Sequence, residues 1–340
     1  MMVSHKISIE SAWDEMKVIR ESPPCFNVWI QTLSYPLSGF ACALTFFGGS
    51  LYDSGIAGLG GLLVGLCALA ATKIRAISRF LEFLGAFLVG ILTRIVTGSS
   101  PAQSCFLAIS ISALVWFLPG LSITQSVMEI ASRSVISGVS RLVYAISVAL
   151  QLGFGLALGS LVVFWGPSES YTNCTAIDRR WHFLTFFGVA ISFNILLNAN
   201  FSQWPGMTIA SGLGLLVSEL ASSSLDPNLT TMLAALTIGM FGFIMARFSH
   251  NHQNALTIVL SGILMLVPGS VGLRGVNALL QNDTVSGTQF GFSMLVVALS
   301  IAIGLLVARM CVQGQVRLRL NPNNMAQHPH YNRLRELPPL

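Results

Sequence analysis

Long stretches without a charged side chain constrain this chain more than any other feature. Several of them exceed the roughly 20 apolar residues that a helix needs to cross a bilayer. They comprise residues 22–52, 54–72, 95–128, 142–168, 181–218, 227–246, 248–273 and 284–308. Only 9% of the residues are Asp, Glu, Lys or Arg, against about 25% in soluble domains. We therefore expect an all-α integral membrane protein.

Glycine, proline, asparagine and charged positions divide these stretches into about ten expected transmembrane helices. They lie near residues 34–50, 55–73, 80–97, 103–118, 138–165, 181–199, 206–224, 229–248, 254–268 and 286–311. Some of these segments are short for a full crossing, which leaves small tilt, local bilayer thinning and broken helices as alternatives.

The positions of the basic residues predict the orientation of the chain in the membrane. With both termini in the cytosol, 14 of the 18 Lys and Arg residues fall on the cytosolic side. The four that remain outside are Arg94, Arg179, Arg180 and Arg274. Asn173 begins a sequon in the longest outer loop and is the one candidate for glycosylation. The host membrane is expected to be the plasma membrane or an endomembrane such as the vacuole.

An internal repeat relates the two halves of the chain. An offset of 149 residues aligns Pro119-Gly120 with Pro268-Gly269, and Ser137-Gly138 with Ser286-Gly287, without a gap. Ten of the 38 aligned positions from residue 119 to residue 156 are identical. Each half contains five expected crossings, so the second half would enter the bilayer from the opposite side and form an inverted repeat.

This repeat predicts the domain organisation of the chain. The expected units are a cytosolic segment with a short amphipathic helix at 1–33, a first five-helix module at 34–166, an outer loop at 167–180, a second five-helix module at 181–312, and a basic, disordered cytosolic tail at 313–340. Six cysteines show no disulfide framework and are expected to be small apolar fillers.

The paired Pro-Gly positions indicate where a solute binds. Proline removes a backbone donor and glycine relaxes steric limits, so the segments 119–137 and 268–286 are expected to break and to line a polar cavity between the repeats. The alternative is that both segments are interfacial connections between ordinary helices. The predicted substrate-binding residues are Pro119, Gly120, Glu129, Arg141, Pro268, Gly269, Arg274 and Asn277.

Ionisable residues in or near a bilayer are candidates for function because their burial in lipid is costly. Glu129 or Arg141 would meet the ammonium or carboxylate of a zwitterionic solute, although a structural role for either residue is the competing reading. Glu219 lies within its expected helix, and it and Asp53 are candidates for proton coupling.

Other functional classes find little support in the sequence. It contains no HExxH, no GxSxG and no GxGD motif, so an intramembrane enzyme is disfavoured. We expect no metal site, because His250 and His252 are interpreted as solvated loop residues. We also expect no cofactor. Membrane lipid and a small solute are the expected partners, nucleic acid is not, and the oligomeric state is left open. A non-transporting scaffold or signalling protein remains an alternative.

Four segments together resemble the threonine/serine exporter family, in particular its fungal pheromone-regulated membrane protein branch. They are FFGGSLYDSGIAGLGGLLVGL, LPGLSITQSVMEIASRSVISGVSRL, QWPGMTIASGLG and MLVPGSVGLRGVNAL. Over residues 34–312 the resemblance implies ten transmembrane helices in a five-plus-five arrangement and export of small hydroxy amino acids. Members of this family carry a longer polar section before the first membrane helices, and we expect this chain to lack it.

Overall fold

Helices account for all regular secondary structure in the described part of the computed structural model. The described residues are 13, 17, 24–99, 104–163, 179–248, 253–266, 271, 273–275, 278 and 284–319. Each of the ten expected segments overlaps a helix, with shifted bounds. These helices are α2 (Val28–Thr45), α3 (Leu51–Lys73), α5 (Leu81–Ser99), α6 (Phe106–Ala113), α8 (Val135–Val162), α9 (Arg179–Leu196), α10 (Trp204–Ala221), α11 (Pro227–Phe248), α12 (Gln253–Leu266) and α14 (Thr284–Arg319).

Fewer helices than ten are long and apolar enough to cross a membrane by themselves. In the described ranges five qualify: Leu51–Lys73, Leu81–Gly98, Val135–Val162, Pro227–Met245 and Thr288–Val312. A sixth is obtained if the bent pair that begins with α6 counts as one span, and shorter apolar helices cover Trp181–Leu196 and Leu256–Leu266. The chain is thus a membrane protein with several apolar helices, while ten crossings stay a prediction.

Both ends of the chain are described only in part. Trp13 and Lys17, which lie in the expected amphipathic helix, are helical. At the other end, α14 continues to Arg319 and so runs past residue 312, the expected end of the second module. The remainder of the expected tail lies outside the described residues.

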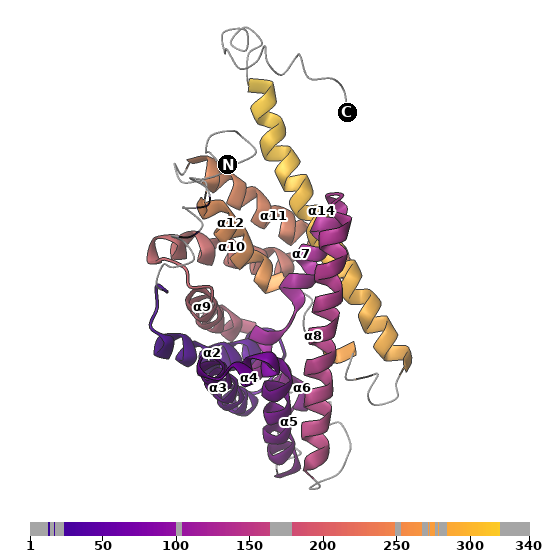
Figure 1. The fold of residues 1–340 in the computed structure, drawn as a ribbon. Coiled ribbons are helices and arrows are strands. Elements are labelled where there is room, and N and C mark those ends of the chain that lie inside the picture. The colour runs from indigo at the N-terminus through magenta and orange to yellow at the C-terminus, as the bar shows by residue number, and fades with distance from the viewer. Residues whose placement is uncertain are drawn as a thin grey trace.

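Helices α2 to α6 of the first half and α10 to α12 of the second half lie at different ends of the molecule (Figure 1). Figure 1 shows α2 to α6 at one end and α10 to α12 at the other, with α9 between them and the long helices α8 and α14 on one side. Helix α2 packs against α3 and α9, α5 packs against α8, and α11 packs against α14. The short helix α7 (Gly120–Ala131) contacts α8 of its own half and α12 and α14 of the other.

Glycines allow two of these helix pairs to approach backbone to backbone. A Cβ atom on Gly155 of α8 would lie 2.6 Å from the carbonyl oxygen of Phe83 in α5. A Cβ on Gly304 of α14 would collide in the same way with the carbonyl oxygen of Met232 in α11. Both members of the second pair stand 149 residues after those of the first. The sequence repeat is therefore also present in the packing, whereas its inverted orientation stays a prediction.

Each half also contributes apolar side chains to the hydrophobic core of the other half. Leu121 and Met128 of α7 pack against the cluster of the second half that contains Ile263 of α12 and residues of α11 and α14. Leu273, from the segment that corresponds to α7, is buried in the cluster of the first half together with Leu114. Helix α7 and Leu273 thus each contribute apolar side chains to the opposite half.

A capping box fixes the start of α3 and ties it to α6. The Asp53 carboxylate accepts hydrogen bonds from the amide and the hydroxyl of Ser50, both at 2.9 Å, and the Ser50 hydroxyl accepts one from the Asp53 amide at 3.1 Å. The second carboxylate oxygen accepts the Cys105 amide at 2.9 Å. Asp53 is only 1% exposed, and a buried charge needs such partners.

The expectation that all cysteines are apolar fillers is wrong at Cys105, which is disulfide-bonded. Cys25, Cys42, Cys67 and Cys311 are free thiols. A disulfide requires two sulfur atoms in a specific mutual geometry, and cysteine spacing along a chain of apolar helices does not encode that geometry. Since disulfides persist in oxidising compartments, this bond agrees with the predicted position of the α5–α6 connection outside the cytosol.

Candidate functional site

The fourth apolar segment is interrupted between Ala113 and Gly120, and the interruption ends at the Pro-Gly pair. Helix α6 ends at Ala113, a 3₁₀ turn η2 spans Val115–Phe117, and α7 begins at Gly120 with Pro119 as its N-cap. The arms Phe106–Ala113 and Val115–Ala131 are bent by 61° at Leu114. The first-turn amides of α7 have no partner within the helix, and such groups are tolerated at membrane depth only beside protein or water.

A cavity of about 680 Å³ lies beside this break. Pro119, Leu121 and Ser122 at the start of α7 line it, together with residues of α2, α5 and α8 from the first half. Side chains of α9 and α12, including Leu197 and Met265, complete the lining from the second half. The volume falls in the range of about 300–1,000 Å³ that is usual for small-molecule sites.

Aromatic side chains dominate the lining of this cavity. They are Tyr35, Phe46, Phe47, Trp116, Phe117, Tyr144 and Phe193. Trp116 of η2 and Phe193 of α9 meet edge to face, with ring centroids 5.8 Å apart, and so form an aromatic contact between the two halves. Tyr35 and Phe117 make a similar contact at 6.4 Å. Among the described lining residues, only Glu82 carries a formal charge.

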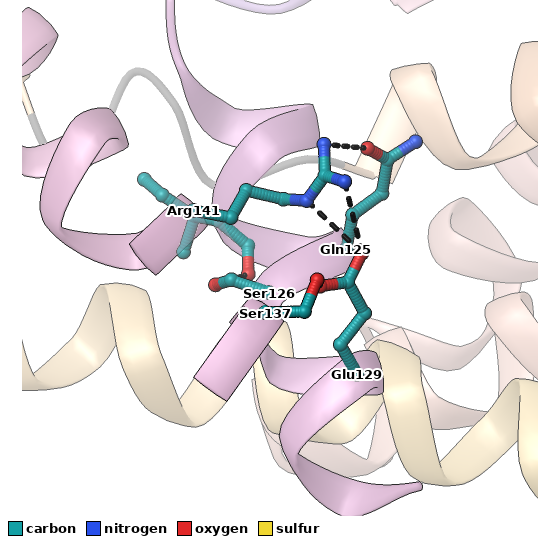
Figure 2. Close-up of polar contacts among 6 residues, drawn as sticks. Gln125, Ser126, Glu129, Ser137 and Arg141 are labelled. Atoms are coloured by element: carbon teal, nitrogen blue, oxygen red, sulfur yellow. Dashed lines mark hydrogen bonds and ion pairs between the residues drawn. The ribbon is translucent and has the colours of Figure 1, made fainter. Parts of the chain in front are cut away.

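A polar cluster occupies the opposite end of α7 (Figure 2). The Arg141 guanidinium pairs with the Glu129 carboxylate through Nη2 and Nε, both at 3.0 Å from Oε1. Ser137 donates a hydrogen bond of 2.7 Å to the other carboxylate oxygen, and Arg141 donates one of 3.4 Å to the Gln125 side chain. The side chains of Arg141 and Glu129 are 42% and 27% exposed, so the pair is accessible from outside the fold.

The turn between α7 and α8 brings this cluster together. The Ser134 amide donates to the Glu129 carbonyl at 2.9 Å and the Arg133 amide to the Ile130 carbonyl at 3.0 Å, the pattern of a Schellman motif. Arg133 has φ of 66° at its left-handed position. Gly138 then permits close packing of the two helices, because a Cβ there would lie 2.8 Å from the Ser126 carbonyl oxygen.

The structure separates the predicted site residues into two places. Pro119 lines the cavity with Gly120 beside it, whereas Glu129 and Arg141 are absent from its lining. Ten helical residues rise about 15 Å, which is the approximate distance along α7 between Pro119 and Glu129. The Glu129–Arg141 pair is therefore a second polar site and not a wall of the cavity.

The corresponding segment of the second half contributes one described residue of the predicted site. Arg274 has a buried Nε atom that has no hydrogen-bond partner among the described residues. Its neighbour Leu273 belongs to the same cluster as Phe117 and Leu118, which line the cavity. The remaining predicted residues Pro268, Gly269 and Asn277, and the sequon residue Asn173, lie outside the described residues.

The two candidates for proton coupling lie away from the cavity. Asp53 is buried and fully hydrogen-bonded at the start of α3, as a structural cap would be, and Glu219 lies partly buried near the end of α10. Neither belongs to the cavity lining. As to metals, the part of the chain that the structure describes contains no group of three His, Cys, Asp or Glu residues suited to a metal ion; His250 and His252 lie outside it.

Most residues that line the cavity were not among the substrate-binding residues predicted from the sequence. Glu82 was recognisable as an ionisable residue near a helix end, and this is a usable signal. The aromatic residues carry no such signal, because membrane helices contain many phenylalanines and the 21 in this chain follow no common spacing. Only the fold shows that Tyr35, Trp116 and Phe193 share one cavity.

Comparisons with known proteins cover both halves of the chain. A threonine/serine exporter family model matches residues 1–163. A second model, described as Threonine/Serine exporter, ThrE, matches residues 182–311. No solved structure matches the chain.

Several fungal proteins are similar to this chain along most of its length. An uncharacterised protein of Schizosaccharomyces pombe is 27% identical over 90% of the chain, which spans 44% of that relative. The pheromone-regulated membrane protein 10 of Kluyveromyces lactis is 26% identical over 91% of the chain, which spans 35% of it. The protein of the same name from Saccharomyces cerevisiae is 28% identical over 84% of the chain, which spans 80% of it.

Proposed function

Because the chain belongs to the threonine/serine exporter family, we propose that it is a secondary transporter of small amino acids. The family models match the first and second halves separately, in the same order as the predicted modules. This proposal takes the solute class from the family description and the place of binding from the structure.

The observation that carries the proposal is a cavity shared by both halves at a helix break. Residues of α2, α5, η2, α7 and α8 line one side, and residues of α9 and α12 line the other. Secondary transporters bind their solutes between structural repeats and beside discontinuous helices. A site with walls from two modules is opened or closed by a small movement of one module against the other.

The unsatisfied Nε of Arg274 offers a partner for the carboxylate of an amino acid. A buried donor without a partner costs about 1–3 kcal/mol, and a planar guanidinium pairs well with a carboxylate. Leu273 packs beside residues of the cavity wall, which brings this segment close to the proposed binding region. Arg274 is therefore the residue of the predicted set that we assign to the solute carboxylate.

The transport cycle in this proposal uses two inverted modules that rock around the cavity, with both termini in the cytosol. Helix α7 contacts α8, α12 and α14, so a movement between the modules must pass through it. No nucleotide-binding loop is present in the sequence, and an ion gradient would drive the cycle, with Glu219 as the proton-coupling candidate. The plasma membrane and an endomembrane such as the vacuole are both compatible with this cycle.

Counterflow of labelled threonine or serine into proteoliposomes that contain the full chain tests this function. We expect saturable counterflow by the wild type and its loss in Leu118→Trp, which fills the cavity. Leu150→Trp is the matched control, because Leu150 is 49% exposed on α8 and outside the cavity lining. Absence of wild-type counterflow of either amino acid would instead favour a non-transporting scaffold or signalling protein.

A further inference from the structure

The cavity beside the α6–α7 break has an unusual combination of walls and charge. Its polar groups are few: the Glu82 carboxylate, the Ser122 hydroxyl and the hydroxyls of Tyr35 and Tyr144. The remaining described walls are aromatic or aliphatic, and no Lys, Arg or His is among the described lining residues. From the described lining, a solute in this space meets the Glu82 carboxylate and several π faces.

Glu82 is free to interact with such a solute. It lies in the first turn of α5 and is partly buried. Among the described residues its carboxylate has no hydrogen-bond or ion-pair partner. A carboxylate in a first turn is favoured by the helix dipole, and this explains why an acidic residue stands at that position. The carboxylate oxygens can still accept hydrogen bonds from a solute.

We propose that Glu82 binds the ammonium group of an amine-bearing solute whose apolar body lies against the aromatic walls. Ammonium groups are attracted to the faces of Trp, Tyr and Phe rings, and Trp116 and Tyr35 are placed in the same lining as Glu82. The volume of about 680 Å³ also accommodates a body larger than the side chain of serine. The recognised chemistry is a primary ammonium on an apolar carbon skeleton.

This inference deepens the proposed function and rests on it only in treating the cavity as a solute site. It assigns the binding of the ammonium group to Glu82, which is not among the substrate-binding residues predicted from the sequence. The amine can come from an apolar amino acid or from a simple organic amine, and the two differ in the carboxylate that Arg274 would receive. Binding is measurable without transport, so the two proposals can fail separately.

Equilibrium binding of labelled 2-phenylethylamine to the purified full chain in detergent tests the proposal. Phenylalanine, 2-phenylethanol and serine serve as competitors. We expect saturable binding to the wild type, a loss of about tenfold in affinity in Glu82→Gln, and partial recovery in Glu82→Asp. The neutral alcohol should compete at least tenfold more weakly than the unlabelled amine, because it lacks the charge.

Asp226→Asn is the matched control, since it removes one carboxylate from an exposed position between α10 and α11. It should leave amine affinity unchanged. Trp116→Leu provides a second variant in case Glu82→Gln does not fold: it should lower amine affinity, whereas Trp116→Phe should retain most of it. Size-exclusion chromatography establishes that each variant is folded.

Three results would overturn the inference: no saturable binding to the wild type, equal affinity in folded Glu82→Gln, or equal competition by 2-phenylethanol. Stronger competition by phenylalanine than by the unlabelled amine identifies an apolar amino acid as the solute, and the reverse identifies a simple amine. Serine counterflow without amine binding removes this inference and leaves the proposed transport intact. Amine binding without threonine or serine counterflow leaves this inference intact and removes the proposed transport of small amino acids.

Discussion

The two halves of this protein share a packing scheme but not their charges. Helix α5 meets α8, and α11 meets α14, through glycines that stand 149 residues apart. At the same offset, Glu129 and Arg141 of the first half correspond to Ala278 and Phe290 of the second. The first half therefore has an ion pair that the second half cannot form at these positions.

This difference separates two kinds of constraint. Close backbone contact tolerates no Cβ atom, so any copy of the packing scheme needs a small residue at the same place. An exposed ion pair contributes little to stability, so a copy can lose it without losing the fold. Repeated residues therefore report on the scaffold, and the unrepeated charged residues are the ones to test for function.

Enlarging the paired glycines should have the largest effect on stability. Gly155→Val and Gly304→Val each place a side chain against a carbonyl oxygen of the facing helix. Overpacking of this kind costs about 3 kcal/mol, and we expect both variants to lose most of the folded, monodisperse protein. Size-exclusion chromatography and thermal unfolding in detergent measure the effect.

Gly291→Ala on α14 is the control for these variants, because a Cβ at that position meets nothing within 4 Å. It should unfold at the wild-type temperature or slightly above it. If Gly155→Val were severe and Gly304→Val harmless, the equivalence of the two helix pairs would be disproved.

Asp53→Asn should have the next largest effect and should distinguish the start of α3 from that of α10. The carboxylate accepts three hydrogen bonds from Ser50 and Cys105, and bonds to a charged group contribute about 1.5–3 kcal/mol. We expect a loss of about 2 kcal/mol in thermal stability. Ser202→Ala, at the equivalent position of the second half, should change stability by less than about 0.5 kcal/mol. Equal losses would contradict the assignment of Asp53 as a cap.

Arg133→Gly should raise stability, since it removes a Cβ from a left-handed position where the L configuration costs roughly 1–2 kcal/mol. Asn198 has φ of 54° after α9 and makes the matching comparison. Asparagine tolerates this conformation better than arginine, so Asn198→Gly should stabilise less. Melting temperatures of both variants provide the measurement, and a lower melting temperature for Arg133→Gly would argue against the turn geometry.

A double-mutant cycle on Glu129 and Arg141 should give the smallest effect on stability. The exposed pair is expected to contribute a coupling free energy of about 0.5 kcal/mol, measured with Glu129→Gln, Arg141→Ala and the double variant. The same three proteins can be assayed for counterflow. Transport rates equal to the wild type in all three would remove this pair from the predicted solute site.

The candidate site was predictable only where local backbone chemistry reveals it. Pro119-Gly120 predicts an interruption because proline and glycine act on their own peptide units, and α7 begins at this pair, whereas the bend of 61° lies five residues earlier, at Leu114. The pairing of Ser137 with Glu129 depends on a turn three residues long and is nearly as local. The cavity joins Tyr35, Trp116 and Phe193, which are far apart in the chain, so no sequence pattern brings them together.

The amino-acid sequence alone was enough to predict a helical membrane protein, to locate its apolar segments, and to find that residues 119–156 repeat after 149 residues. These properties depend on hydropathy and on backbone preferences, both of which act over a few turns of helix. Which helices pack together, that Asp53 accepts a hydrogen bond from the Cys105 amide, and that Glu82 lines an aromatic cavity became known from the three-dimensional fold. Such contacts depend on how distant segments pack in space, and the order of residues along one helix does not specify its neighbours.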